Sequence, residues 1–515
     1  MKINNKLYSL LAATALFAMS SCEKDYLDVN KNPNSLTSAT PQLVLPSALN
    51  NASGGNYNGT NGNSAFRHLN EVGSIWAGQW SPSGSISGFN EEKQYNIAPN
   101  FRTAVWSTSY DNLQDFNYVL TSSTAQGLQG FAGIARVMKA FDYQLLVDAY
   151  GNVPYTDALQ GTKVIHPKYD DAKAIYENLI VQLDSALIDL KAPLSSVNVS
   201  PGSSDIYFKG DLTKWAKFAN TLKLRILMRQ SLVAGRDAYI KAEIAKIVAE
   251  GSGFLGAGQN VVANPGYLSS TGKQNPFYEY YGYTPAGTQS TANNYFGLSD
   301  FTIGKLQTYN DPRLIRIASP VGKNAGTAGD ASATYTGMPL GVSGDQYLYS
   351  KISGFGPGLI KSFSQDQVVM TAAESFFLQA EAVERGFMAG NSQVLYESGI
   401  KESFKLLGVA NAETAASSYY TSGANNVDWS ASSNKIEAII TQKWLALVGF
   451  GGFEAWSEFR RTGYPTGVPR SAAAGTNGRI VRLVYPTSEI STNNESVKAQ
   501  GTIDPRTTRL FWDVD

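Results

Sequence analysis

The amino-acid sequence predicts a mainly α-helical protein in which two long irregular stretches interrupt a series of amphipathic helices. Apolar residues recur about every 3.6 positions over residues 131–150 and 171–190, which indicates helices with one buried face. Residues 251–294 and 319–358 are instead rich in Gly and small or polar residues. Successive amphipathic helices indicate helix-pair repeats of the tetratricopeptide kind. Because the characteristic Trp/Leu/Gly/Tyr spacing is absent, an irregular α bundle is an equal alternative.

The N-terminal residues have the order of an export signal. Lys2 and Lys6 precede an apolar run over residues 10–19, and two serines stand before Cys22, the only cysteine of the chain. This order predicts a signal peptide over residues 1–21, because the apolar run is shorter than the roughly 20 residues of a membrane span. A cysteine directly after small residues is similar to a bacterial lipobox, in which the signal is cut before the cysteine and acyl chains such as palmitate are attached. The alternative is an ordinary signal peptide with an incidental cysteine.

The mature chain divides by composition into a short lead and one large domain. Residues 22–40 begin with a charged run and continue with Asn, Pro and Ser, which predicts a lipidated tether and an N-terminal arm. We expect a single helical domain over residues 41–515, with loop excursions near 251–296 and 319–358. Connections of this length in compact domains are usually binding loops or disordered, and the aromatic residues of the first one favour a binding loop.

The first part of the domain contains two loops rich in Gly and Ser, with helices expected around them. The expected helices span residues 41–51, 65–80 and 100–121, and the loops span residues 53–64 and 81–88.

The later helices carry start and stop signals. The helix over residues 131–150 is followed by Gly151 as C-cap and by Pro154. Asp211 is a candidate N-cap, and Thr371 with Glu374 has the spacing of a capping box. The further expected helices span residues 171–190, 211–226, 237–250, 371–385, 394–407 and 435–448.

Charge and motifs exclude several classes of function. The chain has 42 basic and 42 acidic residues, so no net charge attracts nucleic acid. Its two histidines, His68 and His166, lie far apart and form no metal or triad motif, and no nucleophile elbow or P-loop is present. We therefore expect no metal, no cofactor and no nucleic-acid partner. Glu374, Glu381 and Glu384 share one helix and are the candidates for a hydrolytic carboxylate pair, although all three also fit a solvated or structural face.

Aromatic side chains are the best candidates for ligand contact, because 28 tyrosines and 8 tryptophans supply flat apolar faces with polar edges. Such rings can stack on sugar or peptide. The candidate ligand-binding residues are Trp76, Trp80, Tyr278, Tyr280, Tyr281 and Tyr283. The alternatives are core packing of the two tryptophans one helical turn apart and loop packing of the tyrosines.

Several segments resemble segments of a known family, and they follow one another along the chain in that family's order. They read YLDVNKNPN at 26–34, DAYGNVPY at 148–155, DIYFKGD at 205–211, LKLR at 222–225, YNDPR at 309–313, QKW at 442–444 and EAWSEFRRTGYP at 454–465, together with the helix at 372–385. With the lipobox, these segments resemble the SusD/RagB family of outer-membrane nutrient-binding lipoproteins, in its SusD-like branch. The resemblance covers essentially the whole chain.

The resemblance implies a scaffold of tetratricopeptide-like helix pairs with excursions that carry the ligand surface. It implies a lipid-anchored protein of the outer membrane, facing the exterior, which acts as a lid over a SusC-like TonB-dependent transporter and delivers glycans or, in some members, peptides. It implies no catalysis. Only Cys22 corresponds to a family residue position by position, so the aromatic candidates rest on composition. A surface glycoside hydrolase with a carboxylate pair is the alternative function.

Overall fold

The computed structural model describes residues 39–54, 64–330 and 332–514. The chain divides into two units, residues 1–40 and 41–515, and every element below belongs to the second. The expected signal peptide and Cys22 lie outside the described residues. Among the described helices, none combines the length and the apolar character that a membrane crossing requires.

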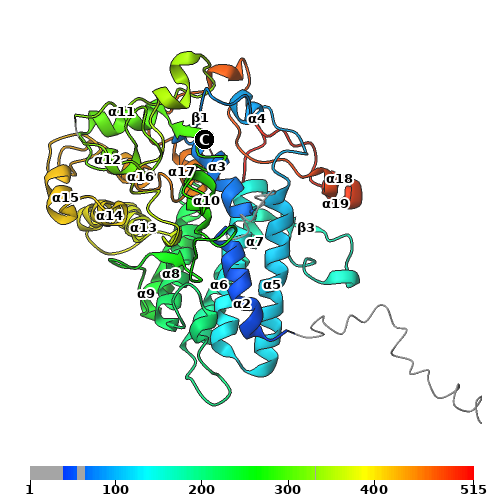
Figure 1. Ribbon diagram of the computed structural model, residues 1–515. Coiled ribbons are helices and arrows are strands. Elements are labelled where there is room, and N and C mark those ends of the chain that lie inside the picture. Colours follow the sequence, from blue (N-terminus) through cyan, green and yellow to red (C-terminus); the bar gives the residue numbers. More distant parts are fainter. Residues whose placement is uncertain (1–38, 55–63, 331, 515) are drawn as a thin grey trace, which may run out of the picture. The chain divides into compact units, whose positions relative to one another are not determined.

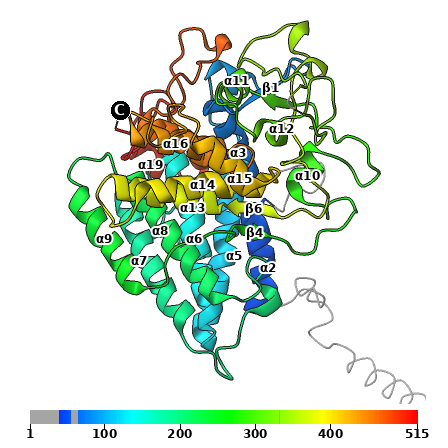
Figure 2. The same ribbon diagram turned by 90° about the vertical axis from the view of Figure 1, so that its left-hand side faces the viewer.

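Helices dominate this unit, and the predicted mainly α fold is confirmed. A row of helices in which each packs on the next in chain order forms one layer (Figures 1 and 2). The row consists of α2 (Pro41–Ala52), α5 (Ala104–Gln126), α6 (Gln129–Tyr150), α7 (Ala172–Lys191), α8 (Leu212–Arg229) and α9 (Asp237–Glu250). This pairing of consecutive helices is the expected tetratricopeptide-like arrangement.

A second group of helices, mostly from the C-terminal half, packs against this row. It contains α3 (Ala65–Trp76), α13 (Ala372–Glu384), α14 (Ser392–Leu407), α15 (Ala412–Tyr420), α16 (Lys435–Ala446) and α17 (Gly452–Thr462). Helix α13 packs on α14, α16 and α8, while α17 packs on α3. Figure 2 shows α13 and α14 running across the row.

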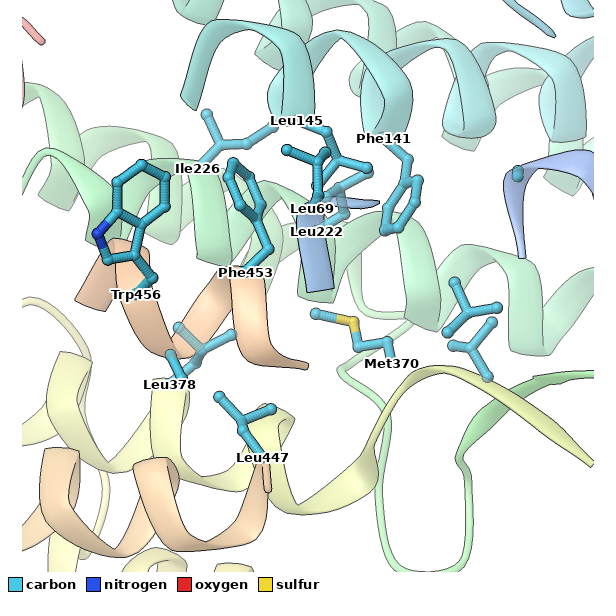
Figure 3. Packing of buried hydrophobic residues seen from close by; sticks show 14 of the residues in the cluster. Leu69, Phe141, Leu145, Leu222, Ile226, Met370, Leu378, Leu447, Phe453 and Trp456 are labelled. Atoms are coloured by element: carbon cyan, nitrogen blue, oxygen red, sulfur yellow. The ribbon is translucent and has the colours of Figure 1, made fainter. Parts of the chain in front are cut away.

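The apolar core lies where the two groups meet (Figure 3). Leu145 of α6, Ile226 of α8, Leu378 of α13 and Phe453 of α17 all belong to one buried cluster. Burial of a side chain of this size contributes about 1.5–3 kcal/mol. This shared core joins helices that are more than 200 residues apart in the chain.

The remaining strands and α-helices are short. The strands form three antiparallel pairs: β1 (Trp80–Pro82) with β5 (Phe296–Leu298), β2 (Val153–Pro154) with β3 (Tyr169–Asp170), and β4 (Val261–Ala263) with β6 (Gln367–Met370). The short helices are α4 (Asn90–Gln94), α10 (Pro276–Tyr281), α11 (Asp300–Thr308), α12 (Leu314–Ile317), α18 (Thr487–Thr492) and α19 (Asn494–Lys498).

The predicted capping residues behave as expected, with one exception. The Asp211 carboxylate accepts hydrogen bonds from the amides of the first turn of α8, and Gly151 follows α6 with a φ of 78°. Thr371 Oγ1 accepts from the Glu374 amide at 3.0 Å. The Glu374 carboxylate, however, binds Arg225 instead of reaching back to the helix start, so only half of the capping box forms.

The helix expected over residues 65–80 is too long. It ends at Trp76, and Gly78 follows in the left-handed conformation with a φ of +72°, which is a common way to end a helix. Trp80 instead pairs with Leu298 in a short strand. Trp76 and Trp80 therefore do not lie one helical turn apart. The helix expected over residues 100–121 spans Ala104–Gln126.

Asp142 on α6 is a buried carboxyl group that forms no ion pair with any described residue. The Asn112 side-chain amide donates a hydrogen bond to its Oδ2 at 2.8 Å. Burial raises the pKa of Asp142 to about 7, and the bond from Asn112 opposes this shift only in part. A folded-state pKa above that of the unfolded chain means that the charged form destabilises the fold.

We therefore expect Asp142→Asn to stabilise the protein at alkaline pH. Because the folded-state pKa of Asp142 is raised, the stability that this group contributes is fully present below its unfolded-state pKa. That contribution is lost as the pH rises through about 7. The gain at pH 8 should be about 2–4 kcal/mol, and it should vanish near pH 4. Urea unfolding of both proteins across this range measures the difference. A variant that is less stable at both pH values would contradict this assignment.

Candidate functional site

Three irregular stretches converge on one region of the domain. The amide of Gly84, in the loop after β1, donates to the carbonyl of Tyr347 at 2.9 Å. The amide of Ser83 donates to the carbonyl of Tyr295 at 2.8 Å. The loop after β1 is thus hydrogen-bonded to both expected excursions, residues 251–296 and 319–358, which are separate in the sequence. Figure 2 shows α10, α11, α12 and β1 on the same side of the domain.

Helix α10 carries three of the candidate tyrosines within this region, Tyr278, Tyr280 and Tyr281. The Asn275 side chain accepts a hydrogen bond from the Tyr278 amide at 2.9 Å, and Pro276 occupies the first helical position. Both are typical helix-start signals, which the prediction of an irregular stretch overlooked. The helix ends before Gly282, and Tyr283 follows directly.

Three tyrosines, Tyr278, Tyr280 and Tyr283, are partly exposed, and we call them the tyrosine face. The rings of Tyr278 and Tyr283 lie 5.9 Å apart between centroids, at an angle of 42°. The Tyr283 hydroxyl donates to the carbonyl of Ala325 at 2.6 Å, which ties α10 to the second irregular stretch. Burial raises the pKa of all three hydroxyls above the usual value, so they stay protonated at neutral pH.

A buried ion network supports the tyrosine face from beneath. The Arg67 guanidinium lies 4.5 Å from the centre of the Tyr280 ring and binds Glu71 at 2.8 Å. The Tyr281 hydroxyl donates to the same carboxylate at 2.6 Å, and Arg102 binds its other oxygen at 2.5 Å. Burial alone would raise the pKa of Glu71, but Arg102 and Arg67 outweigh it and lower the pKa to about 2. The network therefore fixes α10 against α3.

The structure places the other aromatic candidates in the interior. The exposed fractions of Trp76, Trp80 and Tyr281 are 3%, 2% and 1%. Trp80 is enclosed by four rings, at centroid distances of 4.6–6.2 Å: Phe277, Tyr281, Phe296 and Phe355. In this conformation Trp80 has the environment of core packing, the alternative interpretation for the tryptophans, and Tyr281 packs against the same cluster of rings. Trp76 packs on Trp456 at 4.9 Å and also borders a cavity.

Neither histidine has the surroundings of a metal ligand. Burial, together with Arg102 and Arg67, lowers the pKa of His68 to about 3, so this side chain is neutral within the fold. His166 is exposed on a loop. The described residues contain no cluster of His, Cys, Asp and Glu able to hold a metal ion.

Two of the three candidate carboxylates on α13 are bound by arginines. Glu374 pairs with Arg225 and Glu381 with Arg461, each at 2.8 Å. Burial alone would raise the pKa of Glu381, but Arg461 and Arg385 hold it below the usual value, which is unsuitable for a general acid. Glu384 is exposed and accepts a hydrogen bond from Ser392.

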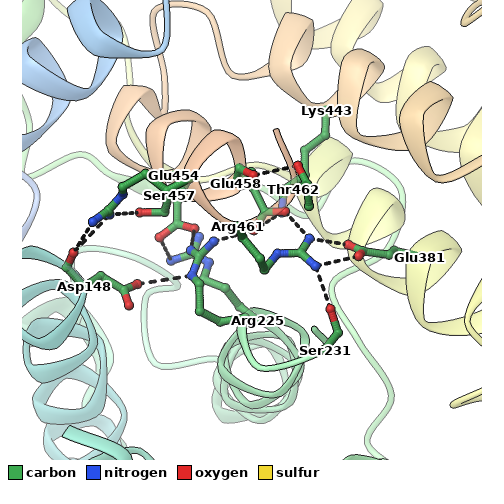
Figure 4. A network of polar contacts seen from close by, with 12 residues as sticks. Asp148, Arg225, Ser231, Glu381, Lys443, Glu454, Ser457, Glu458, Arg461 and Thr462 are labelled. Carbon is green, nitrogen blue, oxygen red and sulfur yellow. Dashed lines mark hydrogen bonds and ion pairs between the residues drawn. The ribbon is translucent and has the colours of Figure 1, made fainter. Parts of the chain in front are cut away.

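These arginines belong to a larger network that joins α6, α8, α13 and α17 (Figure 4). Fully buried Arg229 binds the carboxylates of Glu454 and Glu458, and its Nε lies 3.3 Å from Asp148. Arg461 links Glu458 to Glu381. Apart from Arg229, these residues lie in the sequence segments that carry the family resemblance. Their shared role is therefore to connect the helical layers.

Comparison with known proteins gives a consistent result. A family model described as SusD-like, "Starch-binding associating with outer membrane", matches residues 33–486. Among solved structures, a chitin-binding protein is 25% identical, with a TM-score of 0.74 over 92% of this chain and 100% of that one. A chitin-binding SusD homologue from Flavobacterium johnsoniae is 24% identical, and a SusD homologue from Bacteroides fragilis is 23% identical. Each has a TM-score of 0.74 over 92% of this chain and 99% of its own. Among curated proteins the search found no match.

Proposed function

Because the chain belongs to the SusD-like family of starch-binding proteins that associate with the outer membrane, we propose that it is a surface lipoprotein that captures oligosaccharides for uptake. The protein would bind glycan from outside the cell and pass it to a SusC-like TonB-dependent transporter. The observation that carries this proposal is the tyrosine face, held by a buried network where three loops meet. Aromatic faces with hydroxyl edges suit the alternating apolar and polar surfaces of a sugar.

The tyrosine face is the proposed ligand contact, and the buried aromatic residues behind it hold it in place. Tyr278 and Tyr283 offer partly exposed ring surface, whereas Trp80 and Tyr281 lie beneath and position α10. The chitin-binding relatives favour glycan over peptide as the ligand to test first. The ion pairs of Glu374 and Glu381 give no support to a glycoside hydrolase.

We expect Tyr278→Ala and Tyr283→Ala to weaken oligosaccharide binding while leaving the fold intact. Loss of one stacking ring should cost about 1–3 kcal/mol of binding free energy, by analogy with base stacking on aromatic side chains. Isothermal titration calorimetry with chitooligosaccharides and maltooligosaccharides measures the change. Tyr420→Ala on α15 is the matched control, because it removes a partly buried tyrosine from outside this region.

Two outcomes would contradict the proposal. Unchanged affinity in both tyrosine variants, for a glycan that the wild-type protein binds, would remove the tyrosine face from the site. Sustained release of reducing ends from these glycans, abolished by a single Glu or Asp substitution, would show an enzyme in place of a binding protein.

Anchoring through Cys22 gives a separate prediction. We expect Cys22→Ser to move the protein from the membrane fraction to the soluble fraction, because acyl chains contribute about 0.8 kcal/mol per buried methylene to membrane attachment. Fractionation of cells that express each form measures the distribution. The released protein should bind oligosaccharide with wild-type affinity. Retention of the variant in the membrane fraction would argue against lipidation at Cys22.

A further inference from the structure

The cavity that Trp76 borders lies away from the tyrosine face, between α17, the C-terminal segment and the end of α3. Its volume is about 200 Å³. Its lining combines aromatic side chains, including Trp76, Trp456 and Phe459, with Arg460, Arg479 and Arg509. The Arg460 guanidinium lies 3.6 Å from the centre of the Trp456 ring, and that of Arg479 lies 5.3 Å from the centre of the Phe459 ring. A cavity of about 150 Å³ holds benzene, so this one has room for a single six-membered ring with a substituent.

The arginines give the cavity an excess of positive charge. Of its lining residues only Asp513 is acidic, and it pairs with Arg509. Arg479 donates to the carbonyls of Val468 and Pro469, and within the described residues it forms no ion pair. Arg460 likewise donates to carbonyls and to Ser457, without a carboxylate partner in the described part of the chain.

Arg460 also has an unused donor. The side chain is 6% exposed, and its buried Nε–H group has no acceptor among the described residues. Burial lowers the pKa of Arg460 to about 10, which still leaves the guanidinium charged at neutral pH. A buried charged donor without an acceptor is costly, and a carboxylate is the acceptor that matches guanidinium geometry best.

We propose that this cavity binds a small cyclic carboxylate, whose ring contacts the aromatic lining residues and whose carboxylate accepts hydrogen bonds from the arginines. An acidic sugar such as a hexuronate and an aromatic acid such as benzoate share this chemistry. The proposal goes beyond glycan capture at the tyrosine face, because the two sites have no lining residue in common.

The test is calorimetric titration of the purified protein with glucuronate and with benzoate, with glucose as the neutral comparison. We expect binding in roughly the millimolar range for a ligand of this size. Arg479→Gln and Arg509→Gln should each weaken it about tenfold or more, because each removes a charge-assisted hydrogen bond. Arg470→Gln is the matched control, since Arg470 also donates to backbone carbonyls but does not line the cavity.

The outcomes separate this proposal from the proposed function. Binding of glucuronate but not benzoate assigns the cavity to acidic sugars, and the reverse assigns it to aromatic acids. Neither should be affected by Tyr278→Ala. No saturation by either acid up to about 50 mM, far above the expected range, would overturn the proposal. Equal binding of glucose, or wild-type binding by Arg479→Gln, would overturn it as well, while oligosaccharide capture at the tyrosine face would stand unaffected.

Discussion

Replacing Arg229 with methionine is expected to destabilise the protein by about 3–5 kcal/mol, because removal of one partner leaves buried charge uncompensated. Arg229 is fully buried and faces Asp148, Glu454 and Glu458. Methionine fills similar volume, so the loss is mainly electrostatic. The effect should be large enough to lower the yield of folded protein, since domains are stable by only about 5–15 kcal/mol.

Urea unfolding followed by circular dichroism measures the change, with soluble yield as a second reading. Lys498→Met is the matched control. It removes a cation from the exposed pair with Glu495, whose side chains are 66% and 91% exposed. Pairs of this kind contribute about 0–1 kcal/mol. If Arg229→Met and Lys498→Met shift the unfolding midpoint equally, the charges of the buried network do not stabilise the fold.

Trp80→Ala should cost about 3–5 kcal/mol of folding stability, the usual range for removal of a buried tryptophan. Trp80 fills the space between Phe277, Phe296 and Phe355 beneath α10. We expect the cavity left behind to loosen the tyrosine face, so that oligosaccharide affinity falls together with stability.

Thermal unfolding and calorimetry on the same samples distinguish this role from direct ligand contact. Tyr278→Ala is the comparison, because its ring is partly exposed and its removal should lower the melting temperature much less than Trp80→Ala does. A Trp80→Ala protein with wild-type stability and lost ligand affinity would instead make Trp80 a ligand contact.

The family segments show why conspicuous motifs need not mark a ligand site. Asp148, Arg225, Glu454 and Arg461 come from three of the segments that carry the resemblance, and all four residues lie in the buried network. A buried ion pair needs each partner in place, since loss of one leaves the other unpaired. The tyrosine face, by contrast, contains no residue of these segments.

Local sequence was sufficient to predict the mainly α fold, most helix positions and several caps. Periodicity and capping depend on residues within a few positions, so Asp211 and Gly151 could be assigned from the sequence. The resemblance added the family, which the comparisons confirm. The sequence also supplied the hypothesis that aromatic side chains form the ligand surface.

Only the tertiary structure decided which aromatic residues face outward. Trp80 leaves the helical pattern because β1 pairs with β5, more than 200 residues later in the chain. Tyr281 turns inward to reach Glu71, whereas Tyr278 and Tyr283 keep exposed surface. Aromatic rings suit a core and a binding surface equally well, so composition does not separate the two. Burial depends on what packs against each ring, and here those partners are distant in sequence.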